Sequence, residues 1–391
     1  MTFRTNLLST ILLTGVIAPQ AFASDPIEID ADLGFVFGAL DVEGGVKEAD
    51  VAVNFGIRAE KDAYLDNGTK IGAVIELRAE SPAGQRPGFS GNFRVQDDTG
   101  FGLRAPATGI ALSDNRTDSE GRASFEQAYV YAKNPWGEVS LGRDQGAAAR
   151  LDARAPKVLN YAHATSPTID LSGASIVRSR NDVTGPSAKI TYVTPRILGL
   201  RAGGSYTPKA EARGLDFDNG ATAPGLENAD LENVFEAALS FDHVFRSDLT
   251  RVRVGLTSTI AEPSSVNPVF KDYTAWGAGL EVEKGNLATG IRYLHSNNAV
   301  DNGAYEAVEA GLVYYFEDWT VGAEIGAAQD DLLNIDGSVW SLSAKRNVSP
   351  NISLGFAYTD TRTSGSINVF RNGSDLLAEG KGVLIELTVR K

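Results

Sequence analysis

Stretches in which apolar and polar side chains alternate recur along the whole chain, and residues typical of turns separate them. We count sixteen such segments between Ile27 and Val389. Because successive side chains of a β-strand point to opposite faces, this alternation predicts strands with one apolar and one polar face. The predicted strands span residues 27–40, 51–61, 69–80, 122–133, 138–143, 187–194, 200–206, 234–245, 251–260, 272–283, 287–295, 304–316, 319–328, 338–345, 352–360 and 382–389.

The connections between these strands are of two kinds, short and long. Asp66-Asn67-Gly68 and Lys284-Gly285-Asn286 are typical tight turns. The long connections are residues 41–50, 81–121, 144–186, 207–233, 261–271, 296–303, 329–337 and 361–381. Loops this long argue against a compact soluble domain, whereas outer-membrane barrels have short periplasmic turns and long external loops. The even strand count also fits a barrel of this kind, so we predict an all-β, transmembrane antiparallel β-barrel of about sixteen strands.

Charged residues stay almost entirely on the polar faces of these strands. In the segment 234–245, Phe235, Leu239 and Phe241 share one face, while Glu236 and Asp242 share the other. Lys or Arg facing lipid at mid-bilayer costs about 2–4 kcal/mol, so this separation favours a membrane barrel. A soluble β-sandwich or β-helix with a dry core is the alternative. Aromatic residues beside short turns suit the interfacial rings of a barrel: Tyr131, Trp136, Tyr314, Tyr315, Phe316 and Trp319.

The first residues predict export. Arg4 precedes the short apolar stretch 7–18, and Ala21-Phe22-Ala23 forms an A-x-A cleavage site. Residues 1–23 are therefore a predicted signal peptide, and residues 24–391 form the barrel. The absence of cysteine rules out a disulfide framework and thiol chemistry, which suits a bacterial envelope protein.

The net charge is −14, which argues against nucleic acid as a partner. Acidic loops of this kind could bind divalent cations such as calcium at an outer surface; we expect no other cofactor. Glycine is abundant, with 41 residues, many of them inside predicted strands.

Three blocks of the chain resemble a known family. They are VAVNFGIRAEKDAYLDNGTKIGAVIELRAE (51–80), SFEQAYVYAKNPWGEVSLGRDQG (124–146) and SAKITYVTPRILGLRAGGSYTP (187–208). In this order they are similar to strand-turn-strand units of the general diffusion porins of Gram-negative outer membranes. The resemblance implies a sixteen-stranded barrel, usually a homotrimer, whose third long loop, here about 144–186, folds inward. It implies a water-filled channel for passive diffusion of ions and small hydrophilic solutes, embedded in outer-membrane lipid and lipopolysaccharide.

The resemblance also implies a constriction in which acids of the inward loop face bases on the barrel wall. Asp170 is the first candidate acid and Asp152 the second. The wall candidates are Arg58, Arg78, Arg143 and Lys189. Parity places Arg58, Arg78 and Lys189 on the polar face, but Arg143 shares a face with Val139 and Leu141, so a bulge or strand end must redirect it. We expect Asp170 and Arg58 to face each other.

Several features depart from the family pattern. Val193 and Asn54 stand where basic residues are common, and basic residues outnumber acids in the inward loop. The chain ends Leu387-Thr388-Val389-Arg390-Lys391, without the usual terminal aromatic residue.

Other functions are less well supported by the residues. No metalloprotease, nucleophile-elbow or phosphate-loop motif is present, so we expect no enzyme. A barrel-borne lipid hydrolase would need a Ser–His pair, for which Ser296 and His295 are the candidates. A channel selective for sugars or phosphate and a plugged structural or adhesin barrel also remain open.

Overall fold

The computed structural model describes residues 26–42, 48–81, 103–104, 111–112, 121–165, 167–172, 174–210, 215, 231–266, 268–367 and 374–391. The expected signal peptide, residues 1–23, lies outside these ranges. No helix within these ranges is long and apolar enough to cross a membrane.

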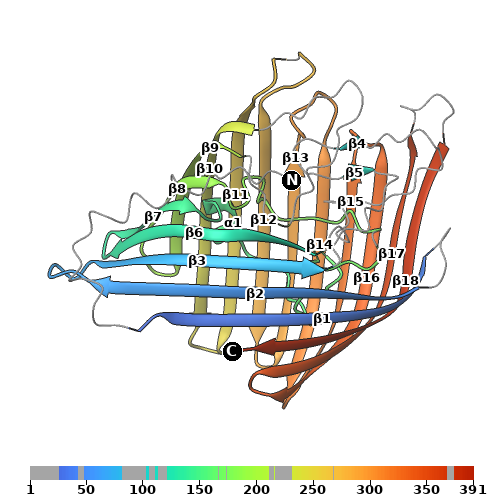
Figure 1. Cartoon of the computed structure of the whole chain (residues 1–391), viewed down its shortest axis with the longest axis horizontal. Helices are drawn as coiled ribbons and strands as arrows, with labels where there is room; N and C mark the ends of the chain where they lie inside the picture. Colours follow the sequence, from blue (N-terminus) through green and yellow to red (C-terminus); the bar gives the residue numbers. More distant parts are fainter. Residues whose placement is uncertain are drawn as a thin grey trace, which may run out of the picture.

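Sixteen antiparallel strands close into one barrel, which confirms the predicted number and class (Figure 1). Their order around the barrel follows the sequence, and the first strand closes the ring by pairing with the last. The barrel strands are β1 (Glu28–Val42), β2 (Glu48–Tyr64), β3 (Lys70–Ser81), β6 (Arg122–Asn134), β7 (Gly137–Arg143), β8 (Ala188–Val193), β9 (Leu200–Lys209), β10 (Leu231–Phe245), β11 (Thr250–Pro263), β12 (Tyr273–Lys284), β13 (Leu287–Ser296), β14 (Tyr305–Phe316), β15 (Trp319–Asp330), β16 (Ile335–Ser349), β17 (Ile352–Ile367) and β18 (Ser374–Arg390). Two short strands, β4 (Leu103–Arg104) and β5 (Ala111–Leu112), form a separate sheet.

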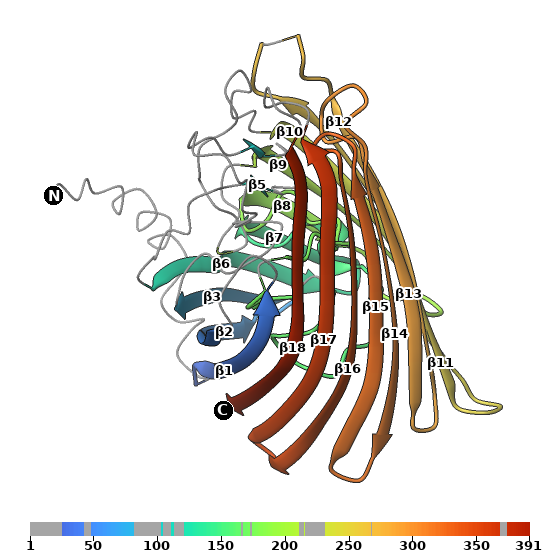
Figure 2. The same ribbon diagram turned by 90° about the vertical axis from the view of Figure 1, so that its right-hand side faces the viewer.

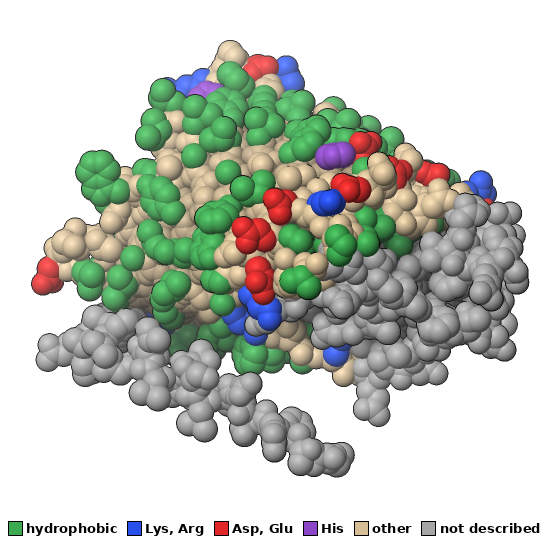
Figure 3. All heavy atoms as spheres, turned by 90° about the horizontal axis from the view of Figure 1, so that it is seen from above, with side chains coloured by type: hydrophobic (Ala, Val, Ile, Leu, Met, Phe, Trp, Pro, Cys, Tyr) green, Lys and Arg blue, Asp and Glu red, His purple; other side chains and the backbone are tan. Residues whose placement is uncertain are grey.

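The alternation read from the sequence separates the outside of the barrel from its inside. On β10, Phe235 and Leu239 are 53% and 55% exposed, whereas Glu236 is 4% exposed. Hydrophobic side chains cover much of the outer wall in the view from above (Figure 3). A closed ring of this kind satisfies the backbone hydrogen bonds of every strand, and its apolar outer face suits lipid.

One aromatic side chain that was expected at the membrane interface, Tyr131, instead points inward. The Tyr131 hydroxyl donates a hydrogen bond to Glu60 at 2.7 Å, on the lumen side of the wall. Tyr131 lies on β6 and faces the polar side of β2, so strand parity outweighs its nearness to the turn. Trp136, in the turn itself, is 82% exposed.

The strands are longer than the apolar pattern predicts on the side of the long loops. Residues 361–381 were expected to form a loop, but β17 and β18 extend to Ile367 and Ser374, which pair with each other. From Thr361 to Ser366 the β17 half of this hairpin contains mostly Thr, Ser and Gly, so the alternation of apolar and polar residues ends there. Strand pairing continues because backbone hydrogen bonds between strands form whether or not the strands face lipid. The alternation of apolar and polar residues marks only the part of each strand that faces lipid.

The longest connection folds into the barrel, as the resemblance implied. We call residues 144–187, which join β7 to β8, the inward loop; it begins with the one-turn helix α1 (Ala147–Arg150). Its trace lies behind β3 and β6 and in front of β11–β16 in Figure 1, and Figure 2 shows the tall wall of β11–β18 from the side.

The inward loop follows the inner wall. Its outbound half contacts β9, then the strands up to β18, and then β1. In order, the contacts join Leu151 to Gly203, Ala153 to Gly255 and Gly279, Pro156 to Gly290 and Gly311, Val158 to Gly322, Leu159 to Gly355 and Tyr161 to Gly34. The loop then turns back, and Leu171, Ser172, Ile176 and Val177 contact β1, β18, β16 and β15.

Glycines of the wall make this close approach possible. At each of twelve wall positions, an added β-carbon would come within 3.0 Å of a loop atom. We call these positions the glycine track: Gly34, Gly38, Gly203, Gly255, Gly279, Gly290, Gly311, Gly322, Gly326, Gly337, Gly355 and Gly380. Since backbone can approach backbone only where no side chain intervenes, the abundance of glycine within the strands has a local cause.

Carboxylates of the wall bind the loop backbone between these contacts. Glu386 of β18 accepts hydrogen bonds from three successive backbone N–H groups, those of Asn160 (2.8 Å), Tyr161 (2.9 Å) and Ala162 (2.9 Å). Glu324 of β15 accepts one from Ala164 at 3.0 Å. Successive N–H groups that converge on one carboxylate form an anion-binding concavity, so each glutamate fixes a bend of the loop.

An apolar cluster completes the packing. Loop residues Val158, Leu159 and Ile169 are buried against Val36 and Leu384 of the wall. Part of the inner surface is therefore a packed core between loop and wall.

We predict that Gly311→Ala destabilises the protein. The new β-carbon would lie 2.2 Å from the Pro156 carbonyl oxygen, so the loop must shift, at a cost of about 1–3 kcal/mol. Gly204→Ala is the matched control, because its β-carbon would meet the Glu236 carbonyl oxygen at 3.6 Å, an ordinary contact. Thermal unfolding in detergent should show a lower midpoint for Gly311→Ala alone. Equal midpoints for the two variants would contradict the close packing of loop on wall.

We also predict that Glu386→Gln loosens the inward loop. The amide keeps the size of the side chain but replaces one accepting oxygen with a donor, which then faces backbone N–H groups. Hydrogen bonds to charged groups contribute about 1.5–3 kcal/mol each, so a loss of at least one such bond should lower the free energy of unfolding by that amount. Glu306→Gln is the control, since the Glu306 side chain is 52% exposed. Chemical unfolding in detergent that gives the same stability for both variants would rule out this anchoring role.

Candidate functional site

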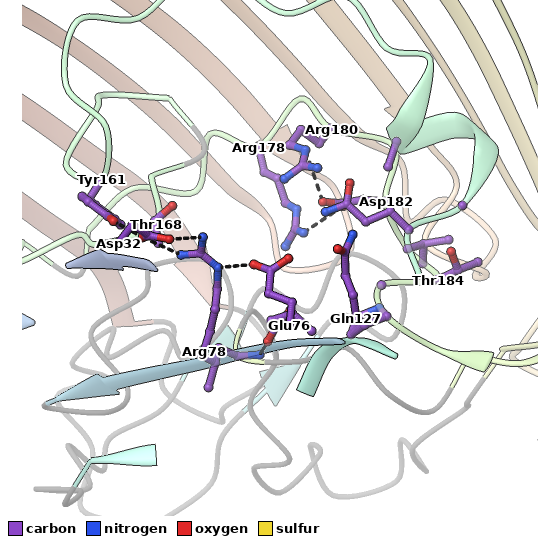
Figure 4. Close-up of a pocket in the computed structure, with 18 of the residues that line it drawn as sticks. Asp32, Glu76, Arg78, Gln127, Tyr161, Thr168, Arg178, Arg180, Asp182 and Thr184 are labelled. Carbon is purple, nitrogen blue, oxygen red and sulfur yellow. Dashed lines mark hydrogen bonds and ion pairs between the residues drawn. The ribbon is translucent and has the colours of Figure 1, made fainter. Parts of the chain in front are cut away.

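The inward loop leaves one side of the barrel interior uncovered. A cavity of about 600 Å³ lies between the loop and the strands β1, β3 and β6. We call this cavity the opening. Figure 4 shows its two sides: Tyr161, Thr168, Arg178, Arg180, Asp182 and Thr184 from the loop, and Asp32, Glu76, Arg78 and Gln127 from the wall.

Arg78 is the centre of the wall side. Its guanidinium pairs with Glu76 at 2.8 Å and with Asp32 of β1 at 3.2 Å, and it donates a hydrogen bond to Asn54 at 3.0 Å. The ladder between β3 and β6 shifts register between Glu76 and Leu77. Asn54, where the family often has a base, is thus a partner that orients Arg78.

The loop side carries two guanidiniums and one carboxylate. Asp182 pairs with Arg178 at 2.8 Å and with Arg180 at 3.6 Å. Burial alone would raise the pKa of Asp182, but the two neighbouring arginines outweigh it and lower the pKa to about 2. The carboxylate is therefore ionised at all physiological pH values, and this edge of the loop keeps both positive charges.

Side chains of the wall hold this edge of the loop in place. The hydroxyl of buried Tyr305 on β14 accepts a hydrogen bond from the Arg178 N–H at 2.8 Å and donates one to the Ile176 carbonyl at 2.7 Å. Asn181 is bound by Thr257 and Thr259 of β11, and the Thr184 hydroxyl donates to Glu236 of β10. The positions of the loop arginines therefore depend on wall residues from several strands.

Of the residues predicted for the constriction, Arg78 lines the opening. Arg58 lies on the adjacent strand β2, where it pairs with Glu60 and, at 3.9 Å, with Asp30. Asp170 accepts hydrogen bonds from the backbone N–H groups of Ser172 (2.8 Å) and Ser175 (3.2 Å), within the loop itself. The structure therefore does not bring Arg58 and Asp170 together across the opening.

Lys189 and Arg143 lie where the two ends of the inward loop meet the wall. The buried Lys189 ammonium donates to the carbonyls of Asp144 and Gly185, at the start and end of the loop. Arg143, the last residue of β7, donates to the Pro186 carbonyl at 3.3 Å, and Gly142 before it has φ +134°. The strand end redirects Arg143, as its parity required.

Asp152 is buried between the loop and the far wall. It pairs with Arg292 of β13, whose side chain is fully buried. Burial raises the pKa of Asp152 to about 6 even though Arg292, Arg154 and Arg180 favour its ionised form. This pair holds the loop against β13 and does not line the opening.

Sequence reasoning missed Asp32, Glu76 and Gln127 as residues of the opening. Strand pairing could have pointed to Asp32 and Glu76. Glu76 is paired across the strands with Arg58, and Asp32 is paired with Gly56, which is in turn paired with Arg78. The inward loop contains apolar residues that are buried, such as Val158, Leu159 and Ile176. They were a further signal, because a loop surrounded by water is mostly polar, whereas apolar residues indicate packing against the wall.

Within the described part of the chain, no group of three or more His, Asp or Glu residues is placed to hold a metal ion. The expected cation sites at external loops fall partly on residues outside the described ranges and stay a prediction.

Comparisons with known proteins agree with this geometry. A family model described as Gram-negative porin matches residues 9–366. No curated protein sequence matches this chain.

Among solved structures, the fold is similar to the outer membrane channel DcaP of Acinetobacter baumannii, with 11% identity, a TM-score of 0.56, and coverage of 93% of this chain and 97% of that chain. It is also similar to the outer membrane protein OmpT of Vibrio cholerae in its trimer form, with 11% identity, a TM-score of 0.54, and coverage of 94% and 99%. A porin refined at 1.8 Å shows 12% identity, a TM-score of 0.52, and coverage of 92% and 100%.

These structural likenesses show the fold, and the family model covers most of the chain, including the inward loop and the strands on both sides of the opening. The chain therefore belongs to the Gram-negative porins, outer-membrane proteins whose barrels form channels for the passive diffusion of ions and small hydrophilic solutes.

Proposed function

We propose that solutes cross this porin through the opening between the inward loop and strands β1, β3 and β6. The observation that supports it is the cavity of about 600 Å³, lined by charged and polar side chains from both sides. Water and small polar solutes can exchange hydrogen bonds with such walls, whereas apolar solutes must displace ordered water. Charged side chains around a narrow opening also bias which ions pass.

The same geometry argues against the competing functions. His295 and Ser296 are neighbours on β13, so their side chains point to opposite sides of the wall. His295 bonds with Glu306 and Ser296 is buried, so these two residues do not form the Ser–His pair that a lipid hydrolase would need. We propose that the protein is not an enzyme. The charged lining of the opening also suits ions and mixed polar solutes better than sugars, which favour rows of aromatic rings.

We further propose that three copies assemble in the outer membrane. A trimer form is described for OmpT of Vibrio cholerae, whose barrel this one resembles. The apolar outer face would then contact membrane lipid and lipopolysaccharide around the assembly and its own copies at the centre. Crosslinking of the purified protein in detergent would test the number of copies.

We predict that the purified protein opens stepwise, ohmic channels in a planar bilayer and that Gln127→Trp lowers the size of each step on the order of twofold. Gln127 lines the opening, so a larger ring there narrows it. Val130→Trp is the matched control on the same strand, because Val130 is 49% exposed on the outer face. The measurement is single-channel conductance in potassium chloride.

Two results would contradict the proposal. A silent bilayer with correctly folded protein would favour a plugged barrel. Equal conductance for Gln127→Trp and Val130→Trp would place the solute path elsewhere in the barrel.

A further inference from the structure

We infer that the inward loop is the positive side of the opening and the wall is the negative side. Solutes that carry an ammonium and a carboxylate at opposite ends would then cross with the carboxylate toward Arg178 and Arg180 and the ammonium toward Asp32 and Glu76. The resemblance implied the opposite arrangement, with acids on the loop and bases on the wall. This inference rests on the proposed function and names the solute class that the opening favours.

The loop side has an excess of positive charge. Of the loop residues that line the opening, Arg178 and Arg180 are basic and Asp182 is the single acid, so this side sums to +2 − 1 = +1. Asp182 stays ionised because its pKa lies at about 2. Asp152 and Asp170, the other acids considered, bind Arg292 and the loop backbone, respectively, and do not line the opening.

The wall side has an excess of negative charge. Its lining acids are Asp30, Asp32, Glu76 and Glu126, and its lining bases are Arg78, Arg390 and Lys391, so its side chains sum to −4 + 3 = −1. Arg78 is shared between Asp32 and Glu76, and one guanidinium cannot neutralise two carboxylates.

The two sides face each other across the opening. Figure 4 shows Arg178 extending from the loop toward Glu76 on β3, with Arg180 and Asp182 beside it. Protein walls of low polarity on both sides focus the field between such groups and weaken its screening by solvent. An elongated solute with two opposite charges lowers its energy by aligning across this field, whereas an uncharged solute of similar size has a much smaller dipole and gains far less from it.

The orientation is built into the packing of the loop. Tyr305 binds the backbone of Arg178, and Asn181, between Arg180 and Asp182, is bound by Thr257 and Thr259. These bonds fix which loop residues face the opening. Asp152 or Asp170 could replace Arg178 and Arg180 there only if the loop detached from the glycine track.

The test compares variants that neutralise one side each. Arg178→Gln with Arg180→Gln removes the positive side, and Asp32→Asn with Glu76→Gln removes the negative side. Arg246→Gln is the control, because Arg246 is exposed in the turn between β10 and β11 and does not line the opening. Each variant is measured for its reversal potential in a potassium chloride gradient. Each is also measured for swelling rates of proteoliposomes in glycylglycine and in xylitol, an uncharged solute of similar mass.

We expect the loop variant to shift the reversal potential toward cation preference and the wall variant to shift it toward anion preference. Both variants should lower the ratio of glycylglycine to xylitol entry by about twofold or more, because alignment needs both sides. A site that acts by net charge alone would move the two reversal potentials but leave this ratio unchanged. Arg246→Gln should match the wild type in every measurement.

The inference is overturned if the ratio stays at its wild-type value in a variant that still conducts and admits xylitol, or if a reversal potential moves in the other direction. If the loop variant does not fold, the wall variant alone decides. Because Asp32 also accepts a hydrogen bond from Tyr161 of the loop, Glu76→Gln by itself takes the place of the double wall variant if that one does not fold. Should the wild-type protein neither conduct nor admit xylitol, the proposed function itself fails, which is a distinguishable outcome.

Discussion

The contact of the inward loop with bare backbone of the wall is the constraint on which the rest of the interior depends. A loop of this length inside a barrel must satisfy its own N–H and C=O groups away from bulk water. Here the glycine track lets it lie flat on the strands, and Glu386 and Glu324 accept hydrogen bonds from its N–H groups. The glycine track and the two glutamates depend on each other, because the carboxylates reach the loop backbone only where no wall side chains hold the loop away.

This arrangement also determines where the opening lies. The loop covers the wall from β9 through β18 to β1, so the free cross-section is displaced toward β1, β3 and β6. Charges between the loop and this wall, such as Asp152 of the loop and Arg292 of β13, become parts of a packed interface. Charges on the uncovered strands, such as Arg78 and Glu76, remain in contact with the opening. The same residue type therefore has a structural role on one side of the barrel and faces solutes on the other.

The sequence predicted the barrel well because its cause is local. Which side chain faces lipid follows from strand parity, and residues such as Phe235 and Glu236 lie on the sides that parity assigned. The strand ends beyond the membrane were not predictable in this way, because the alternation of apolar and polar residues in β17 stops before the strand does. The site was predicted only in part. Arg78 lines the opening, but Arg58, Asp152, Asp170, Arg143 and Lys189 have other partners in the structure.

The part of the site that could not be predicted is the path of the inward loop, because the alternation of apolar and polar residues contains no information about it. Whether Asp170 or Arg178 reaches the opening depends on where the loop turns back, and that turn is fixed by contacts more than a hundred residues apart in the chain, such as Tyr305 with Arg178. The glycine track offers a way to read such a path. Glycines at inward-facing positions of successive strands have no reason to be there in a water-filled pore, since any small polar residue would serve. A row of them across neighbouring strands therefore indicates the line along which a backbone lies. Charges on loop residues beyond the end of that row, such as Arg180 and Asp182, are the ones left to face the solute.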